Sequence, residues 1–559
     1  MGKTVRFACG AASVVTFVIG VLLIIAGLVV VLKVVPDQTK KTIKEQKQLI
    51  KYKNGTYNDY TKDWANPKYI SRIQYWVYDY KNPISIINRG QLPDMDEKGP
   101  YTYVETTTND IDGMQDDDRM LTYTQHIKYV FDPTQSCLGC DPLVDKVLVP
   151  DVSYFVAMQT LTELPLGALC QQLFPTLPCE LIEEEYETVI LSLIDDALAA
   201  FKAGPFIEVT IDKLLISGYE PPFYTRFIQN VADFICLLLL TPPSQCVVSS
   251  PQNVSYGQTL NYTSPHYTIL TGKGDYQRVG FIQSFTMENQ YNESQPWITN
   301  GTLLPAAWWS DCGGDIQASL HARTIRGNTG DFFPSFLKTT DVVPIYVDSI
   351  CRSIDMTYQK KCTYEGIDCY RFELPATEFN WGPRENCGFC FPLQYDFYDK
   401  NAGDACYPDG IMDLSGCQDG APIAISKPHF YQASDIVRNF VPRLRSKASE
   451  DDNIIMDVEP QTGTILMAHK RMQINVMANQ FPNISTMSVF MPGAYPIYWL
   501  NESFYADQGT VHDIKSDLIN QVKLYKIICY SVVGLGGLLM LLSLLSMFGV
   551  IYAQRHKDD

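Results

Sequence analysis

Cysteine is the residue type in this sequence whose spacing could support the most chemistry. Seven of the sixteen cysteines lie between residues 351 and 417. So dense a group of thiols forms either a metal site in a reducing compartment or a disulfide framework in an oxidising one. Cys137-x-x-Cys140 and Cys387-x-x-Cys390 also have the spacing of half a zinc ribbon or of a redox pair, and we interpret both as structural.

The other candidates for chemistry do not predict an enzyme. The sequence has no Gly-x-Ser-x-Gly elbow, no His-Glu-x-x-His and no phosphate-binding loop. Asp457 and Glu459 could form an acid-base pair, but beside Pro460 and Gly463 we interpret them as turn carboxylates that accept backbone hydrogen bonds. His429 is interpreted as a packed turn residue rather than a base. We therefore predict no catalytic residue, no metal ligand and no cofactor.

Two apolar runs near the ends of the chain decide the compartment. Residues 7–32 and 527–553 contain no charged side chain and are long enough to cross a bilayer as helices. A cleaved signal peptide is the alternative for the first run, but its apolar stretch is too long. Basic residues lie in the short tails 1–6 and 554–559, which predicts that both termini are cytoplasmic. Residues 33–526 are then expected to lie in the lumen or outside the cell.

The middle region has the composition of an oxidising compartment. It holds fourteen cysteines, an even number, and it also holds seven Asn-x-Ser/Thr sequons. Disulfides are therefore favoured over zinc, and each sequon is a predicted glycosylation site. The seven asparagines are Asn54, Asn253, Asn261, Asn292, Asn300, Asn483 and Asn501. Cys9, on the cytoplasmic side, is a predicted palmitoylation site.

Charge and hydrophobicity exclude some partners. A net charge of −18 argues against nucleic acid and against an anionic membrane surface. The seven histidines are scattered, without metal-ligand spacing on a helix. With 46% hydrophobic and 12% aromatic residues, the middle region can bury a large core.

The local pattern of the middle region is mostly that of antiparallel strands. Short aromatic and β-branched runs are separated by turn residues such as Asn82-Pro83 and Gly99-Pro100, which predicts a sheet or barrel. The expected strands are residues 73–78, 101–104, 121–124, 127–131, and stretches within 267–285 and 342–350.

The segment 150–250 instead has a helical period, with expected helices at 182–201, 210–217 and 222–240. Within it, Cys170 with Cys179 and Cys236 with Cys246 are close enough to staple local loops. Thirteen acidic residues against three basic ones make its helix faces either a solvated surface or a docking surface for a protein.

A set of short motifs, in order between the two apolar runs, resembles the class B scavenger receptors, a family that includes fatty-acid and lipoprotein receptors. The resemblance covers about 64–502 and is weakest in the segment 150–250. Its motifs include Trp64-Ala65-Asn66-Pro67, Glu97-Lys98-Gly99-Pro100-Tyr101, Val130-Phe131-Asp132-Pro133, Ser349 to Ile354, Cys406-Tyr407-Pro408-Asp409-Gly410, Ser426-Lys427-Pro428-His429-Phe430, Asp457 to Gly463, Lys470 to Asn475 and Trp499-Leu500-Asn501-Glu502.

The resemblance implies an α+β membrane protein. Its ectodomain would be a large antiparallel β-barrel with an apolar tunnel and an apical helical bundle, anchored by two transmembrane helices. A disulfide-rich region, 312–417, would carry the family's three bonds, Cys312–Cys387, Cys351–Cys417 and Cys390–Cys406. Cys362 is then paired with Cys369 as an additional bond, and Cys137 with Cys140 as the last pair.

The implied function is a cell-surface receptor that binds fatty acids, sterol esters or lipoprotein particles and passes them through the tunnel to the membrane. Lys202 is the nearest match to a lysine that contacts fatty-acid carboxylates in relatives. The alternative is a trafficking or adhesion receptor that binds a protein at the apex. The C-terminal tail lacks an acidic di-leucine signal, which favours the plasma membrane over the endosome or lysosome. Gly20 and Gly27 leave homo-oligomerisation open.

Overall fold

The computed structural model divides into two compact units, which are described separately. It describes residues 2–163, 168, 170–171, 178, 204–221, 232–233, 235–237, 239–242, 254–257, 260–288, 297–382, 384–389, 406–418, 420–442, 444, 447–481, 484 and 487–555. The first unit comprises residues 1–48, 365–367 and 506–559, and the second comprises residues 49–364 and 368–505.

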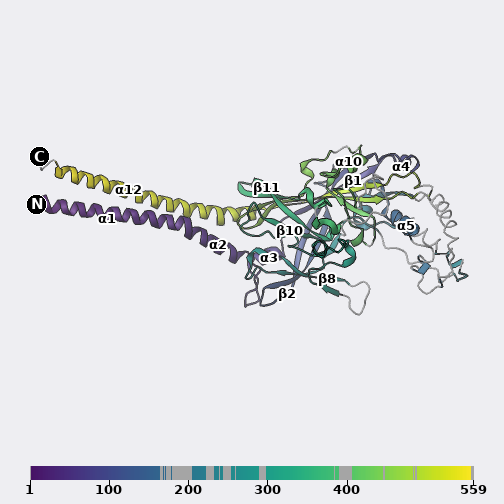
Figure 1. Cartoon of the computed structure of the whole chain (residues 1–559), viewed down its shortest axis with the longest axis horizontal. Coiled ribbons are helices and arrows are strands. Elements are labelled where there is room, and N and C mark those ends of the chain that lie inside the picture. The colour runs from purple at the N-terminus through teal and green to yellow at the C-terminus, as the bar shows by residue number, and fades with distance from the viewer. Residues whose placement is uncertain are drawn as a thin grey trace. The chain divides into compact units, whose positions relative to one another are not determined.

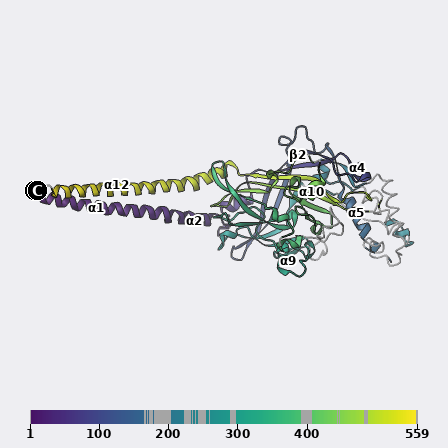
Figure 2. The same cartoon turned by 45° about the horizontal axis from the view of Figure 1, so that its top comes forward.

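The first unit is built from the two ends of the chain. Its helices are α1 (Gly2–Val29), α2 (Val35–Gln46), α11 (Gln508–Asp513) and α12 (Gln521–Arg555), with π-helical turns at Val30–Val34 and Ile514–Asn520. α1 and α12 run side by side, with the two termini at the same end of the pair (Figure 1; Figure 2). Two stretches, Ala12–Gln46 and Gln508–Gly549, are long and apolar enough to cross a membrane.

Small residues set the approach of α1 to α12. A Cβ atom added to Gly20 would lie 2.7 Å from the carbonyl oxygen of Gly536, and one added to Gly27 would lie 2.7 Å from a methyl group of Val533. The hydroxyl groups of Ser13 and Ser546 are 2.9 Å apart. Small residues permit such close packing of apolar helices. Gly20 and Gly27 therefore face the chain's own second helix, which corrects the idea that they serve self-association.

The second unit contains one large antiparallel sheet and one small one (Figure 2). The large sheet has the strand order β10-β11-β12-β15-β16-β17-β1-β2-β3-β7-β8-β9, with β14 also paired to β16, β13 to β14 and β6 to β3. Its strands are β1 (Ser71–Tyr80), β2 (Met95–Gln115), β3 (Met120–Phe131), β6 (Asn261–Thr263), β7 (His266–Leu270), β8 (Ile282–Glu288), β9 (Trp297–Asn300), β10 (Val342–Val347), β11 (Arg352–Tyr364), β12 (Ile367–Glu373), β13 (Met412–Asp413), β14 (Ile423–Ser426), β15 (Ile455–Glu459), β16 (Thr464–Ala478) and β17 (Gly493–Tyr505).

Short helices lie between these strands, in the second unit. They are α3 (Asp59–Ala65), α4 (Pro83–Arg89), α5 (Val152–Glu163), α9 (Ile316–Arg323) and α10 (Asp435–Phe440). The small sheet pairs β4 (Lys146–Pro150) with β5 (Phe206–Thr210). The sequence did not predict this pair, because it borders the segment with helical period. Residues 211–217 are helical as expected, but Thr210 belongs to β5.

Two other strand predictions were wrong in detail. The runs 121–124 and 127–131 form one continuous strand, β3, because Gln125 and His126 continue the ladder toward Ser264 and Thr263. Gly99-Pro100 is not a turn between strands but lies inside β2, opposite a register shift in β1. A Cβ atom on Gly99 would lie 2.5 Å from the carbonyl oxygen of Tyr75, so this close approach of two strands requires glycine.

One loop joins strands from the two far ends of the large sheet. The backbone N–H of Ile282, in β8, donates to the carbonyl of Gly327 at 2.8 Å, and that of Tyr346, in β10, donates to the carbonyl of Asn328 at 2.7 Å. The buried amide of Asn328 holds the loop in place by donating to the carbonyl of Phe332 at 2.8 Å. Backbone groups that would otherwise be free edges are thereby paired.

Disulfide bonds fasten the second unit. The structure joins Cys137 to Cys140, Cys312 to Cys387, Cys351 to Cys417 and Cys362 to Cys369. Cys170, Cys236 and Cys406 are also disulfide-bonded, and their expected partners Cys179, Cys246 and Cys390 lie outside the described residues. The bonds that close long loops remove the most entropy from the unfolded chain.

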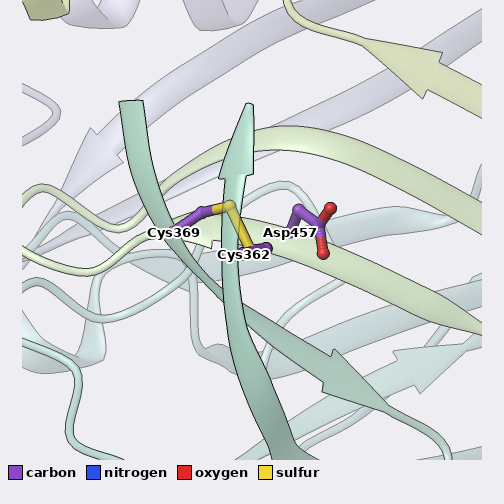
Figure 3. Close-up of side chains that lie close together, drawn as sticks. All are labelled: Cys362, Cys369 and Asp457. Atoms are coloured by element: carbon purple, nitrogen blue, oxygen red, sulfur yellow. A yellow bond between two sulfur atoms is a disulfide. The ribbon is translucent and has the colours of Figure 1, made fainter. Parts of the chain in front are cut away.

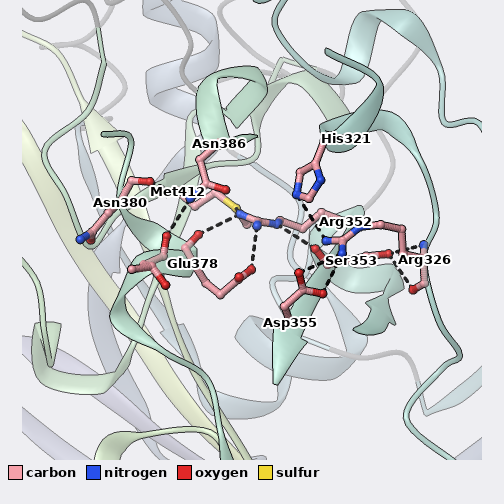
Figure 4. Close-up of polar contacts among 10 residues, drawn as sticks. His321, Arg326, Arg352, Ser353, Asp355, Glu378, Asn380, Asn386 and Met412 are labelled. Atoms are coloured by element: carbon pink, nitrogen blue, oxygen red, sulfur yellow. Dashed lines mark hydrogen bonds and ion pairs between the residues drawn. The ribbon is translucent and has the colours of Figure 1, made fainter. Parts of the chain in front are cut away.

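A buried arginine organises the disulfide-rich region next to Cys351 (Figure 4). The side chain of Arg352 is 0% exposed; it donates to the carboxylate of Glu378 at 2.9 Å and lies over the ring of Phe389 at 3.5 Å. Burial lowers the pKa of Arg352 to about 10, although Glu378 acts in the opposite direction. This pair therefore ties β11 to the segment that carries Cys387.

Candidate functional site

The group of Cys362, Cys369 and Asp457 has the right residue types for a metal centre but the wrong chemistry (Figure 3). The two sulfur atoms are bonded to each other, so neither is a thiolate ligand. The two carboxylate oxygens of Asp457 accept hydrogen bonds from Arg371, each at 2.7 Å. The expectation that Asp457 is a turn carboxylate was wrong, because it lies in β15 and pairs across strands.

The neighbouring predictions fare differently. Glu459 accepts hydrogen bonds from the backbone N–H groups of Gln461 at 3.0 Å and Thr462 at 2.7 Å, as a turn carboxylate does. His429 is a buried turn residue with φ 54°. Both therefore have structural roles within the second unit.

His429 is also held between two acids. Its Nδ1 lies 3.0 Å from a carboxylate oxygen of Asp452, and its Nε2 lies 3.2 Å from one of Glu97. Burial alone would lower the pKa of His429, but the bonds to Asp452 and Glu97 outweigh it and raise the pKa to about 9. The imidazole is thus charged at neutral pH and joins three segments of the chain.

Charged residues gather at one place on the inward side of the large sheet. We name Glu105 of β2, Lys470 of β16 and Glu502 of β17 the inner cluster. Lys470 lies directly opposite Glu502, and their charged atoms are 3.0 Å apart. β1 lies between β2 and β17, where Ser71 is the partner of Glu105 and Ile73 is the partner of Glu502. The cluster therefore spans four adjacent strands.

The neighbours of the inner cluster show which face it occupies. Residues two positions apart in a strand share a face. Met472 lies two residues from Lys470, Leu500 two from Glu502, and Tyr103 two from Glu105; all three are buried in the hydrophobic core. The charges thus interrupt an otherwise apolar, aromatic face.

The electrostatics of the inner cluster are those of a desolvated place. Burial and the charge of Glu502 raise the pKa of Glu105 to about 8, against the opposing influence of Lys470. Burial lowers the pKa of Lys470, but Glu502 and Glu105 more than offset this and leave it raised. Burial also raises the pKa of Asp331, and Glu502 adds to that rise. Acids are therefore the larger charged presence on this face.

Several buried polar atoms near the inner cluster have no hydrogen-bond partner among the described residues. They are one carboxylate oxygen of Glu105, Oε2, and the hydroxyl groups of Tyr75 and Tyr103. The other oxygen of Glu105 accepts from Thr107 at 3.2 Å. An unpaired buried polar group costs roughly 1–3 kcal/mol, so each of these atoms can gain from a ligand that supplies a partner.

The sequence analysis did not identify the inner cluster. Lys470 and Glu502 belong to motifs that carry the family resemblance, but no role was given to them. A signal was present, because each is a charged residue at the apolar parity of a strand. Lys202, the ligand contact expected instead, lies outside the described residues and stays a prediction.

The predicted modification sites fall into three groups. Asn54 and Asn261 are exposed. Asn501 is only 7% exposed, and its amide contacts His469 at 3.0 Å and Gln74 at 3.3 Å, so the prediction of a glycan there is corrected. The remaining sites stay predictions because their residues or side chains lie outside what the structure describes; they are Asn253, Asn292, Asn300, Asn483 and Cys9.

The fold defines a class of protein: a large antiparallel domain flanked by two long apolar helices at the ends of the chain. Comparison with known proteins gives the family. The model of the CD36 family matches residues 18–547, and the chain belongs to this family of class B scavenger receptors. The family resemblance is thereby confirmed, and the chain is a receptor of this family, not an enzyme.

Its relatives are similar over most of their length. An uncharacterized protein of Caenorhabditis elegans is 38% identical over 99% of both chains. Human lysosome membrane protein 2 is 26% identical over 96% of this chain and 93% of its own. Rat scavenger receptor class B member 1 is 23% identical over 87% of this chain and 79% of its own.

Proposed function

We propose that this chain is a membrane-anchored receptor that binds lipid inside its sheet domain and delivers it to the bilayer. The observation that carries the proposal is the inward face of the sheet. It combines buried aromatic and aliphatic side chains with a charged cluster whose members are incompletely satisfied. A soluble protein core of this kind would normally exclude such groups, whereas a lipid-binding interior uses a few polar groups to orient its ligand.

Accessibility at the inner cluster supports an internal space. Lys470 keeps 30% of its side-chain surface accessible and Glu502 keeps 32%. Nevertheless, burial is the strongest influence on the pKa of Lys470. A side chain that is both accessible and desolvated borders a space enclosed by protein. The loop at Gly327 and Asn328, which bonds to both β8 and β10, supports closure of the sheet into a barrel around that space.

The proposed delivery step follows from chain connectivity. The sheet unit begins shortly after α2 ends at Gln46, and β17 ends at Tyr505 just before α11 begins at Gln508. Both ends of the sheet domain are thus tied to helices that can cross a bilayer. Burying each methylene group of a lipid gains roughly 0.8 kcal/mol, so an apolar interior can hold a water-insoluble molecule until it reaches the membrane.

The same features support the proposed location. The antiparallel pair α1 and α12 places both termini on one side of the membrane, and the basic residues at the two ends favour the cytoplasm. The disulfide bonds place the sheet domain in the lumen or outside the cell. We propose the plasma membrane as the main site, with endosomes or lysosomes as the alternative.

A cell assay tests this function. Cells expressing the full chain are given fluorescent fatty acid or fluorescent cholesteryl ester, and uptake is compared with cells that carry an empty vector. The proposal predicts greater uptake in proportion to the amount of receptor at the surface. Uptake equal to that of the empty vector, with the receptor at the surface, contradicts the proposal. A Glu208→Gln variant, altered at an exposed residue of β5, is the matched control and should equal wild type.

A further inference from the structure

We propose that the inner cluster of Glu105, Lys470 and Glu502 is a binding site for the hydroxyl head of a neutral lipid, such as a sterol or a long-chain alcohol. In this proposal the cluster discriminates against the free fatty-acid anion. The inference rests on the proposed function, since it names the lipid class and the residues that receive it.

The first argument is hydrogen bonding. Glu105 is 8% exposed, and its Oε2 atom has no partner among the described residues. Burial keeps Glu105 largely protonated near neutral pH, so its carboxyl group can both donate and accept. A hydroxyl group also both donates and accepts, and it can therefore satisfy the carboxyl group without bringing a charge into the interior. The unpaired hydroxyls of Tyr75 and Tyr103 offer further partners close by on the same face.

The second argument is charge. Lys470 is the cation of the cluster, and its ammonium group is already bound to Glu502 at 3.0 Å. Glu502 and Asp331 also lie close enough to raise the pKa of Glu105. A carboxylate ligand would add another negative charge where acids already disfavour one another. It would also lose its hydration without gaining a free cation.

The third argument is the shape of the surroundings. Tyr75 and Tyr103 pack edge to face with their ring centroids 6.0 Å apart, and Tyr75 also packs on Tyr498 at 5.6 Å. Ile73 and Leu500 complete an apolar wall around the charges. Flat aromatic and aliphatic walls of this kind suit a sterol ring system or an alkyl chain. The polar group of such a lipid would then meet the inner cluster.

Binding to the purified full-length receptor in detergent micelles tests the proposal. Three tritiated probes share the same chain: 1-hexadecanol, hexadecanoic acid and the methyl ester of that acid. The alcohol has a hydroxyl donor and no charge, the acid is an anion at neutral pH, and the ester has neither donor nor charge. We expect the alcohol to bind roughly tenfold or more tightly than the acid, because a buried charge without a partner is strongly disfavoured. We expect the ester to bind more weakly than the alcohol.

Substitutions at Glu105 separate the site from the rest of the interior. Glu105→Gln keeps an amide that donates and accepts, and it should preserve binding of the alcohol. Glu105→Leu removes both capacities, and it should reduce binding of the alcohol to the level of the ester. Both variants remove an acid and should improve binding of hexadecanoic acid. Glu208→Gln removes an exposed acid on β5 and is the control that should change none of the three affinities.

The outcomes distinguish the inference from the function on which it rests. If none of the probes and no cholesteryl ester binds to wild-type receptor, the proposed function itself fails. If lipids bind but the acid equals or exceeds the alcohol, or the ester equals the alcohol, the inference is overturned while the function stands. The comparison among probes uses wild-type protein, so it holds even if a Glu105 variant does not fold.

Discussion

The charged imidazole of His429 predicts a loss of stability at alkaline pH that one substitution removes. The pKa of this side chain rises from its model value of 6.5 to about 9 in the folded protein. Since one pKa unit corresponds to about 1.4 kcal/mol, the contacts with Asp452 and Glu97 contribute on the order of 3 kcal/mol. A folded-state pKa above the unfolded value means that this contribution is complete below about pH 6.5 and is lost as the pH rises through about 9.

The measurement is the free energy of unfolding of the full-length protein, with its disulfides intact, from denaturant titration across this pH range. Lys427 acts in the opposite direction, because burial lowers its pKa to about 7 and its contribution rises with pH. The difference between wild type and His429→Gln therefore isolates the histidine. We expect wild type to lead by about 3 kcal/mol near pH 6, with the lead shrinking as the pH passes about 9.

A control variant defines the background of this experiment. His126 has a 44% exposed side chain beside Asp110, at 3.4 Å, and His126→Gln should follow the wild-type profile. If wild type and His429→Gln differ by the same amount at every pH, the reasoning about the buried imidazolium is refuted.

The remaining predictions concern the disulfide-rich region and the glycans. Arg352→Leu leaves Glu378 buried without its partner and should lower the free energy of unfolding by about 3–5 kcal/mol. Arg326→Leu, at a more exposed ion pair, should cost less, and equal losses in the two variants would contradict this. On gels, Asn261→Gln should remove one glycan and Asn501→Gln none; a shift with the second would show that Asn501 is accessible. Cys351→Ser should retain the receptor in the secretory pathway, since losing such a bond typically costs roughly 2–5 kcal/mol, and normal surface levels would speak against that.

The amino-acid sequence predicted the features that arise from local pattern. The two uncharged runs are helices, and the aromatic and β-branched runs are antiparallel strands. Gly20 and Gly536 were small residues suited to helix packing, but their mutual contact depends on how α1 and α12 align. Gly99-Pro100 looked like a turn because glycine and proline usually end strands, whereas here the glycine permits close approach of β1 and β2.

The inner cluster shows why the candidate site could not be read from the sequence in full. Glu105 and Glu502 are separated by most of the chain, and they meet because β1 lies between β2 and β17. Local patterns do not give the order of strands in a sheet. The buried pair of Asp457 with Arg371 was missed for the same reason, because β12 and β15 become neighbours only in the folded sheet.

The most direct test of a lipid-binding interior is to find where a bound lipid lies. Full-length receptor in cells is labelled with a photoactivatable sterol, purified, digested and mapped by mass spectrometry. The account predicts label on the inward face of β16 and β17, in peptides that contain Met472 and Leu500, and competition by unlabelled sterol. Label confined to α1 and α12, with none on these strands, would contradict it.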